Sequence, residues 1–241
     1  MKIAAIMAGS MDGPVESGAI GAVVAERGAA LIWHYRRQNH PMPAPDDYDA
    51  LIVFGGEVSV HDLALKPYFD SLAQCILAFH KLNKPILGSC LGSQAIAYAF
   101  GAKVFAQGFL EYGFTPLTPT QAAETDPLLE GLDFTPTIFE MHSDTFELPV
   151  DASLLLTGEA IRHQAFRLGE STYGFQCHFE VNPNIVTTWT ERELIGNPNH
   201  SPATVSEIYQ QVMLDFERYQ SDQQRFAHQV VNRWLDLIPN S

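Results

Sequence analysis

The sequence predicts an α/β protein in which a mixed, mostly parallel β-sheet is flanked by helices. In the first half of the chain, short apolar runs alternate with longer segments whose apolar residues recur at helical spacing. Parallel strands buried on both faces read as continuous apolar runs, and the helices that connect them cover the sheet. With 241 residues, 46% of them hydrophobic, the chain is long enough for one such domain, or for one domain with an appendage.

Strands and helices are expected to alternate up to residue 100. The expected strands are Ile3–Ala8, Leu31–Tyr35, Ala50–Phe54 and Pro85–Gly88. The expected helices are Glu16–Arg27, Pro67–Leu82 and Leu91–Phe100. Gly28 and Gly101 end the first and third helices, because glycine readily adopts the conformation that closes a helix. The segment Pro41–Pro45 is a loop, since proline cannot donate to a strand ladder.

Beyond Lys103 the pattern changes to closely spaced, strand-like runs separated by Pro and Gly. These runs are Val104–Ala106, Tyr112–Leu117, Thr137–Met141, Leu154–Thr157, Ala165–Leu168 and Thr172–His178. Such spacing predicts hairpins added at one end of the sheet.

The last part of the chain is expected to be helical. A helix over Ile185–Leu194 is followed by a break at Gly196–Asn199. From Ala203 to Ile238, apolar residues recur at steps of three, four or seven, which places them on one helical face. The polar run Gln220–Gln224 leaves open whether this segment is one helix or two. We expect a domain over residues 1–195 and a C-terminal helical extension, 196–241, packed on the same domain.

The charge balance argues against nucleic acid and membranes as partners. The chain carries 14 Lys and Arg residues against 28 Asp and Glu residues, a formal net charge of −14. Binding to nucleic acid or to an anionic membrane surface depends on basic side chains that neutralise phosphate. We therefore expect neither partner.

Cysteine usage and the N-terminus predict a soluble cytoplasmic protein. Cys75, Cys90 and Cys177 form no Cys-x-x-Cys pair, which argues against a disulfide framework and a thiolate zinc site. The apolar run at the N-terminus stops at Gly9, short of the roughly 7–15 apolar residues of a secretory signal. No stretch approaches the ~20 apolar residues of a membrane span. No metal and no other cofactor is expected.

The turn Gly88-Ser89-Cys90-Leu91-Gly92 is the first candidate for chemistry. A buried strand becomes a helix there, and glycines two residues either side of a nucleophile are typical of a nucleophile elbow, whose sharp turn crowds its neighbours. Helix N–H groups and the helix dipole stabilise a thiolate at that position, and the Leu91 N–H points where an oxyanion would form. Free cysteines are also often small buried hydrophobes, so the turn alone leaves both interpretations of Cys90 open. Cys75 and Cys177 are expected to be buried spectators.

A cysteine nucleophile needs a general base, and His178 is the best candidate. Glu180 follows two residues later in what reads as a strand, where residues i and i+2 project to one face. Glu180 could then orient the imidazole while the other ring nitrogen faces the thiol of Cys90. By itself, this motif is also typical of a solvated histidine at a strand end. Its occurrence together with the nucleophile elbow favours the general base. His142 is the next candidate, as a substrate-site residue or a loop histidine, and the other histidines lack metal-ligand spacing.

Taken together, these motifs resemble the class I, triad-type glutamine amidotransferases, and most of all stand-alone proteins similar to the glutaminase domain of GMP synthase. The resemblance runs from about Ile3 to about Trp189. The segments that carry it are Gly55-Gly56, Gly88–Gln94, Glu111–Gly113, His142–Phe146, Gln164–Arg167 and Phe175–Glu180. It implies a flavodoxin-like fold, in agreement with the alternating pattern.

The resemblance also implies a role for each matching position. Cys90 would be the nucleophile, His178 the base and later the acid, and Glu180 the carboxylate that orients it. The backbone N–H groups of Gly56 and Leu91 would form the oxyanion hole. The substrate-binding residues would be Gln94, His142, Ser143 and Asp144.

Three positions depart from the family pattern. Phe179 stands where the family usually has proline between the histidine and the glutamate, so a rigid turn is lost. Glu57 stands where the family usually has proline after the two glycines, which adds a carboxylate beside the site. Ser143 replaces the glycine of a His-Gly-Asp loop, which puts the close backbone approach to substrate in question.

Three functions follow from these residues. The first is hydrolysis of the side-chain amide of glutamine to glutamate and ammonia through a γ-glutamyl thioester. The second is hydrolysis of a γ-glutamyl peptide or conjugate by the same triad, and the third is a non-catalytic regulatory subunit that kept the fold. The sequence has no phosphate-binding loop and no second domain for an ammonia acceptor, so either a separate synthetase subunit docks here or the enzyme acts by itself.

Overall fold

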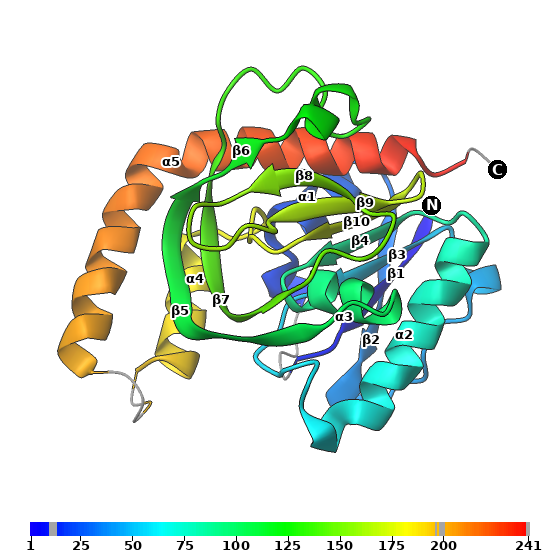
Figure 1. Cartoon of the computed structure of the whole chain (residues 1–241), viewed down its shortest axis with the longest axis horizontal. Coiled ribbons are helices and arrows are strands. Elements are labelled where there is room, and N and C mark those ends of the chain that lie inside the picture. Colours follow the sequence, from blue (N-terminus) through cyan, green and yellow to red (C-terminus); the bar gives the residue numbers. More distant parts are fainter. Residues whose placement is uncertain (10–13, 196, 198–200, 240–241) are drawn as a thin grey trace.

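The computed structural model describes residues 1–9, 14–195, 197 and 201–239. Its centre is an eight-stranded sheet in the order β2-β1-β3-β4-β10-β9-β8-β6 (Figure 1). The strands are β1 (Lys2–Met7), β2 (Ala30–Tyr35), β3 (Ala50–Phe54), β4 (Ile86–Ser89), β6 (Thr118–Pro119), β8 (Ser153–Thr157), β9 (Ala165–Leu168) and β10 (Thr172–Phe175). The first five strands in this order run parallel, and β9, β8 and β6 continue the sheet as antiparallel strands. The expected α/β fold with added hairpins is confirmed.

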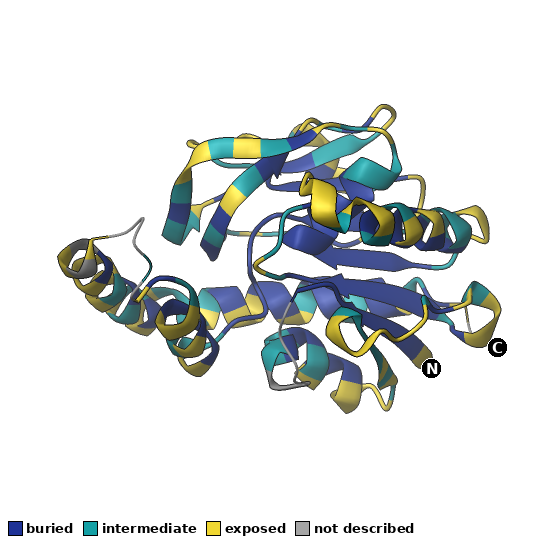
Figure 2. Cartoon of the chain, turned by 90° about the horizontal axis from the view of Figure 1, so that it is seen from below, coloured by how far each residue is buried: buried dark blue, intermediate teal, exposed yellow. Residues whose placement is uncertain are grey.

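Helices cover both faces of the sheet. They are α1 (Gly18–Glu26), α2 (Lys66–Lys81), α3 (Leu91–Ala99), α4 (Pro183–Glu193) and α5 (Pro202–Asp236). Short 3-10 segments lie at Pro14–Ser17, Arg36–Gln38, Pro45–Asp47, Leu63–Leu65 and Gln121–Thr125. One apolar core joins the sheet to α1, α4 and α5, and a second joins it to α2 and α3. Alternate residues of β1 belong to the two cores, so the strand is buried on both faces, as its continuous apolar run predicts (Figure 2).

Two further strands form a separate ribbon. β5 (Val104–Pro116) pairs antiparallel with β7 (Thr137–Phe146) and not with the main sheet. The pairing shifts register between Ala106 and Glu111, and Gly108 lies there at a φ of +89°, which favours glycine. From the sequence we expected two separate runs, Val104–Ala106 and Tyr112–Leu117, in place of β5, and a strand that ends at Met141 in place of β7. Both expectations are wrong. Because β7 continues to Phe146, the His142–Asp144 segment lies in a strand and not in a loop.

The C-terminal segment is one helix that bends around the end of the sheet (Figure 1). The break predicted at Gly196–Asn199 lies outside the described residues, apart from Asn197. The polar run Gln220–Gln224 does not interrupt α5, because Gln223 is buried and its side chain is hydrogen-bonded to two backbone groups outside the helix. α5 packs on α1 and on the β5–β7 ribbon. Within the described part of the chain, no helix combines the length and the apolar character that a membrane crossing needs.

Candidate active site

The turn between β4 and α3 is strained around Cys90. Cys90 is the N-cap of α3 and adopts a φ of 48° and a ψ of −107°, a backbone conformation that residues other than glycine rarely adopt. A Cβ on Gly92 would lie 1.9 Å from the carbonyl oxygen of Val53, and one on Gly88 would lie 2.6 Å from the carbonyl carbon of Gly92. Both glycines of the motif are therefore required by close backbone contacts, which is the steric argument for a nucleophile elbow.

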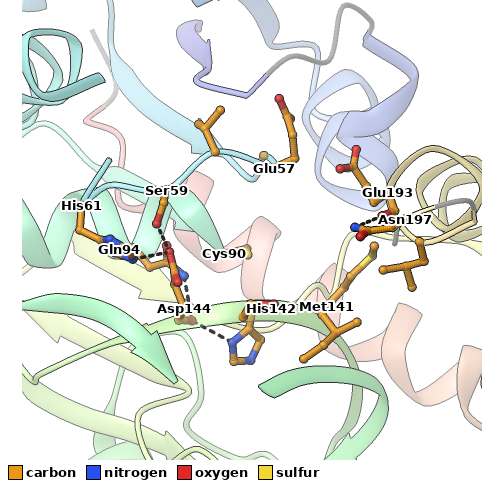
Figure 3. A pocket seen from close by; sticks show the side chains of 15 residues that line it. Glu57, Ser59, His61, Cys90, Gln94, Met141, His142, Asp144, Glu193 and Asn197 are labelled. Carbon is orange, nitrogen blue, oxygen red and sulfur yellow. Dashed lines mark hydrogen bonds and ion pairs between the residues drawn. The ribbon is translucent and has the colours of Figure 1, made fainter. Parts of the chain in front are cut away.

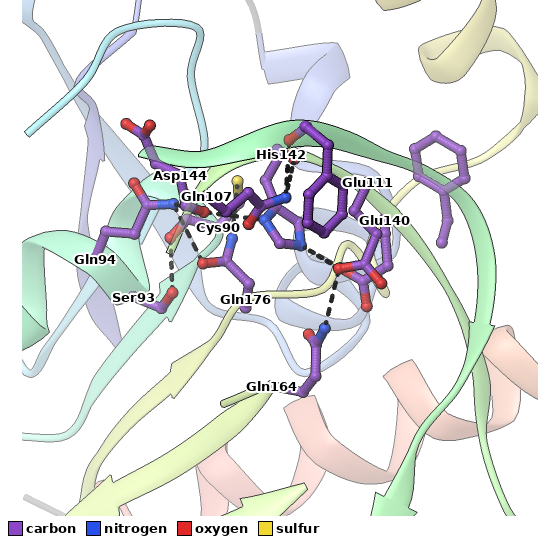
Figure 4. Close-up of polar contacts among 12 residues, drawn as sticks. Cys90, Ser93, Gln94, Gln107, Glu111, Glu140, His142, Asp144, Gln164 and Gln176 are labelled. Carbon is purple, nitrogen blue, oxygen red and sulfur yellow. Dashed lines mark hydrogen bonds and ion pairs between the residues drawn. The ribbon is translucent and has the colours of Figure 1, made fainter. Parts of the chain in front are cut away.

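The thiol of Cys90 is enclosed by polar groups. Cys90 is 5% exposed, and the Nε2 of Gln176 donates to its sulfur at 3.5 Å (Figure 4). Gln94 donates in turn to the Oε1 of Gln176 at 3.2 Å. Leu91 is the first residue of α3, so its N–H has no partner within the helix. This setting provides hydrogen-bond donors for a thiolate and for an oxyanion beside it.

His178 and Glu180 form a buried pair. The Nδ1 of His178 lies 2.8 Å from the Oε1 of Glu180, and the two side chains are 3% and 2% exposed. The hydroxyl of Ser89 donates to the same carboxylate oxygen at 2.8 Å. Burial alone would lower the pKa of His178, but the negative charges of Cys90 and Glu180 outweigh it and hold that pKa well above its usual value.

The pair is held by a turn and not by a strand, which corrects the expectation for Thr172–His178. β10 ends at Phe175, and the segment that carries His178 and Glu180 has no regular structure. Its position is fixed by backbone hydrogen bonds: the His178 N–H donates to the carbonyl of Phe139 at 2.8 Å, and the Glu180 carbonyl accepts from the Ala19 N–H at 2.8 Å. The two side chains meet because the chain turns between them.

Gly55 and Gly56 let the end of β3 approach Cys90 closely. A Cβ on Gly55 would lie 3.1 Å from the imidazole Cε1 of His178 and 3.5 Å from the Cβ of Cys90. A Cβ on Gly56 would lie 2.5 Å from the Cα of Gly9. The glycine pair therefore keeps the space between thiol, imidazole and the end of β1 clear of side chains.

A cavity of about 450 Å³ opens at Cys90 (Figure 3), and a smaller hollow of about 60 Å³ adjoins it. Both hollows are lined by Gly56, Glu57, Cys90, Met141 and Glu193. The larger one adds Val58, Ser59, His61, Gln94, Leu110, His142, Ser143, Asp144, Leu194 and Asn197. The smaller one adds His178, Trp189 and Arg192. The cavity thus extends from Cys90 in two directions, one toward Asp144 and one toward the imidazole.

One wall of the larger cavity is built on Asp144. Its carboxylate accepts a hydrogen bond from the Ser59 hydroxyl and lies 3.2 Å from the Nε2 of His61. Its backbone carbonyl accepts from the Nε2 of Gln94 at 3.1 Å. Ser143, the neighbouring position, is exposed and lines the cavity. Gln94, Ser143 and Asp144 therefore lie together beside Cys90.

His142 lines the cavity, but both of its ring nitrogens face protein groups. Its Nδ1 lies 3.0 Å from the Asp144 carbonyl oxygen, and its Nε2 lies 3.0 Å from Glu111 and 3.3 Å from Glu140 (Figure 4). Burial opposes the charge on His142, but the two carboxylates outweigh it and raise the pKa of His142 to about 10. Burial also raises the pKa of Glu140 to about 7.

Glu111, Glu140 and His142 also have metal-ligand chemistry, since their donor atoms lie within 4.8 Å of one another and all three side chains are buried. Protonated His142 carries a positive charge that compensates the negative charge of the two carboxylates in this buried position. This cluster stabilises the wall that presents the Asp144 carbonyl to Gln94.

Several residues at the site were not identified from the sequence. Ser89 and Gln176 lie within motifs that were identified, and a polar residue inside a largely apolar run is the signal that could have indicated them. Ser59, Glu140 and Trp189 carry no local signal. They reach the site only because the loop after β3, the strand β7 and the helix α4 converge on it.

Comparisons with known proteins identify the family of this chain. The family model described as "Glutamine amidotransferase class-I" matches residues 20–195. A glutamine amidotransferase-like protein, YfeJ, of Salmonella typhimurium is 34% identical over 166 residues, which cover 67% of this chain and 69% of that protein. One subunit of the glutamine-hydrolysing GMP synthase of Methanosarcina mazei is 30% identical over 143 residues, 57% of this chain and 67% of that protein.

A solved structure extends the likeness over the whole chain. The crystal structure of a glutamine amidotransferase from Methylobacillus flagellatus superimposes with a TM-score of 0.83 at 26% identity, covering 100% of this chain and 96% of that one. The family match spans the elbow, the His178–Glu180 pair and every residue of the cavity lining except Asn197. The chain therefore belongs to the class I glutamine amidotransferase family.

Proposed function

We propose that this protein hydrolyses the side-chain amide of glutamine through a Cys90-His178-Glu180 triad. The observation that carries the proposal is the buried arrangement in which the strained Cys90 and the imidazole of His178 line one hollow, close to each other beside Gly55, with the imidazole held by the Glu180 carboxylate at 2.8 Å. A nucleophile, a base and an orienting group in this relation form the minimal set for acyl transfer through a thioester.

In the first half of the reaction, the Cys90 thiolate attacks the amide carbon of the substrate. The negative oxygen that forms would be stabilised by the N–H groups of Leu91 and Gly56, each worth about 3 kcal/mol of barrier. The imidazolium of His178 donates its proton to the leaving nitrogen, and ammonia departs. A γ-glutamyl thioester remains on Cys90.

In the second half, water replaces ammonia. Neutral His178 removes a proton from the water, whose oxygen attacks the thioester carbon. The tetrahedral oxyanion uses the same two N–H groups, and its collapse breaks the carbon–sulfur bond and releases glutamate. Gln94, Ser143 and Asp144 are placed along the larger cavity, where they would contact the glutamyl part of the substrate.

The three departures from the family pattern leave these groups in place. Phe179 is buried and its ring packs on Phe175, with centroids 5.1 Å apart. Glu57 lines the cavity, and Ser143 lies at its rim in β7. None of the three removes a donor, acceptor or nucleophile from the proposed mechanism.

Labelling with an electrophilic glutamine analogue, such as a chloroketone, tests the proposal. We expect alkylation of Cys90 and loss of ammonia release, while Cys75 stays unmodified because burial raises the pKa of its thiol to about 12. Cys90→Ala should abolish ammonia release, and the matched Cys75→Ala variant should retain it. Release that survives in Cys90→Ala contradicts the proposal, and failure of the analogue to label Cys90 favours a non-catalytic regulatory protein.

A second candidate function is hydrolysis of a γ-glutamyl peptide or conjugate. The observation that favours it is the hollow on the imidazole side of Cys90, which His178, Trp189 and Arg192 line and which holds about 60 Å³. The leaving group departs on the side of the acid that protonates it, so this hollow could receive a leaving amine larger than ammonia. Comparing kcat/KM for glutamine with that for γ-glutamyl dipeptides separates the two functions.

We further propose that residues 1–195 form the glutaminase domain and residues 196–241 its helical extension. Similarity to one subunit of a GMP synthase supports, as a partner, a separate synthetase that would accept ammonia. Co-purification of such a synthetase, with ammonia release that rises when it is added, would support that arrangement.

A further inference from the structure

We propose that α5 is a positioning element for the catalytic pair, acting through Gln223 and Phe226, which hold the turn that carries His178 and Glu180. This inference rests on the proposed triad. It gives a role to two sequence features that the function by itself does not use, namely the polar run inside α5 and the phenylalanine at position 179.

The turn needs support because neither strand pairing nor a proline ring fixes it. β10 ends at Phe175, before the catalytic pair begins, and position 179 is Phe where the resembled family usually has proline. Proline would lock one backbone dihedral, whereas phenylalanine leaves it free. The geometry of His178 and Glu180 therefore depends on contacts made from outside the turn.

Gln223 supplies two of these contacts. Its Oε1 accepts from the Phe139 N–H at 3.0 Å, and its Nε2 donates to the Val181 carbonyl at 2.9 Å. The Phe139 carbonyl accepts in turn from the His178 N–H at 2.8 Å. Gln223 is 1% exposed, so water cannot replace it. One amide group thus links α5 to the residue that follows Glu180 and to the strand residue that holds the backbone of His178.

Phe226 supplies a third contact one turn further along α5. Its ring lies 5.8 Å from that of Phe179 and 6.3 Å from that of Phe175, at interplanar angles of 69° and 81°. The three rings are fully buried. Edge-to-face packing of this kind restricts the position of Phe179, which lies between the two catalytic residues. The ring contact therefore replaces part of the rigidity that a proline would have given.

Ordinary helix packing is the alternative, and it makes a different prediction. A contact that only stabilises the fold lowers stability when it is removed and leaves the catalytic constants of the folded protein unchanged. A contact that positions the pair changes kcat with little effect on KM, because neither Gln223 nor Phe226 lines the substrate cavity.

The test compares Gln223→Leu with Gln229→Leu. Gln229 is the matched control, since it lies on the same helix and donates to a backbone carbonyl, that of Leu128, away from the pair. We expect Gln223→Leu to lower kcat about 10- to 100-fold with KM within about threefold, and Gln229→Leu to stay within about twofold of the parent protein. Equal kcat values for the two folded variants would overturn the inference.

A readout without turnover separates this inference from the proposed function. NMR titration of the His178 imidazole, assigned with His178→Asn, should show a lower pKa in Gln223→Leu than in Gln229→Leu, because the contact with Glu180 is loosened. If the parent protein does not hydrolyse glutamine, the proposed function fails while this titration still decides the positioning role. An unchanged titration overturns that role. If Gln223→Leu does not fold, Phe226→Leu takes its place, with the same expected directions.

Discussion

Ser89 is the residue whose substitution tests the proposed role of His178 and Glu180 most directly. Its hydroxyl donates at 2.8 Å to the Oε1 of Glu180, the same oxygen that faces the Nδ1 of His178. Ser89 is 0% exposed and Glu180 is 2% exposed, so in Ser89→Ala no water replaces the lost donor. The carboxylate would then keep the imidazole as its one side-chain partner.

The cost follows from the charge and the burial of the acceptor. A hydrogen bond to a buried charged group contributes about 1.5–3 kcal/mol, against about 0.5–1.5 kcal/mol for one between neutral groups. Ser93→Ala is the matched control, because the Ser93 hydroxyl is equally buried and donates at 2.7 Å to a neutral acceptor, the Cys90 carbonyl. We expect Ser89→Ala to lose about 2 kcal/mol of unfolding free energy, and Ser93→Ala about 1 kcal/mol.

Urea unfolding and ammonia release measure the two consequences. A loss of about 2 kcal/mol lowers the urea midpoint by about 1 M at an unchanged slope. If the imidazole loses about 1.4 kcal/mol of its stabilisation in the transition state, kcat falls about tenfold. The reasoning is refuted if Ser89→Ala costs no more stability than Ser93→Ala and retains the parent kcat.

Two further variants test the packing and the charge around the site. Gly92→Ala places a Cβ 1.9 Å from the carbonyl oxygen of Val53 in the central sheet, so we expect a loss of at least about 3 kcal/mol in chemical unfolding, and an unchanged midpoint would contradict the steric account. Glu140→Gln should flatten the pH dependence of Tm between about pH 5 and 7. Burial raises the pKa of Glu140 to about 7, so the folded state binds more protons than the unfolded state in this range and stability falls as pH rises. A slope that persists in Glu140→Gln argues against this assignment.

The positions of the strands and helices around Cys90 were predictable from the sequence. The apolar run that became β3 and the glycine spacing around Cys90 carry local signals, because burial on both faces and a crowded turn restrict residue types within a few positions. The β5–β7 ribbon was not predictable. It lies apart from the main sheet and packs on α5, a helix distant in the sequence, so its place in the fold has no local signal.

His178 and Glu180 show how a contact can be predicted from the wrong local structure. The spacing of His178 and Glu180 predicted two side chains on one face of a strand, and their side chains do meet, at 2.8 Å. They meet in a turn beyond β10, which hydrogen bonds to Phe139 and Ala19 hold. Sequence spacing fixes how close two residues can come, whereas the backbone path between them depends on distant partners.

The sequence by itself therefore determined the fold class, the family and the residues that carry reactive groups, since these depend on local periodicity and on side-chain chemistry at fixed spacing. Only the tertiary structure decided how these groups are held. Ser89, Gln176 and Gln223 are ordinary polar residues in the sequence, and each acquires a partner through burial against a segment distant along the chain. A buried polar group must find such a partner or lose the free energy of its hydration, and that requirement acts only once the chain has folded.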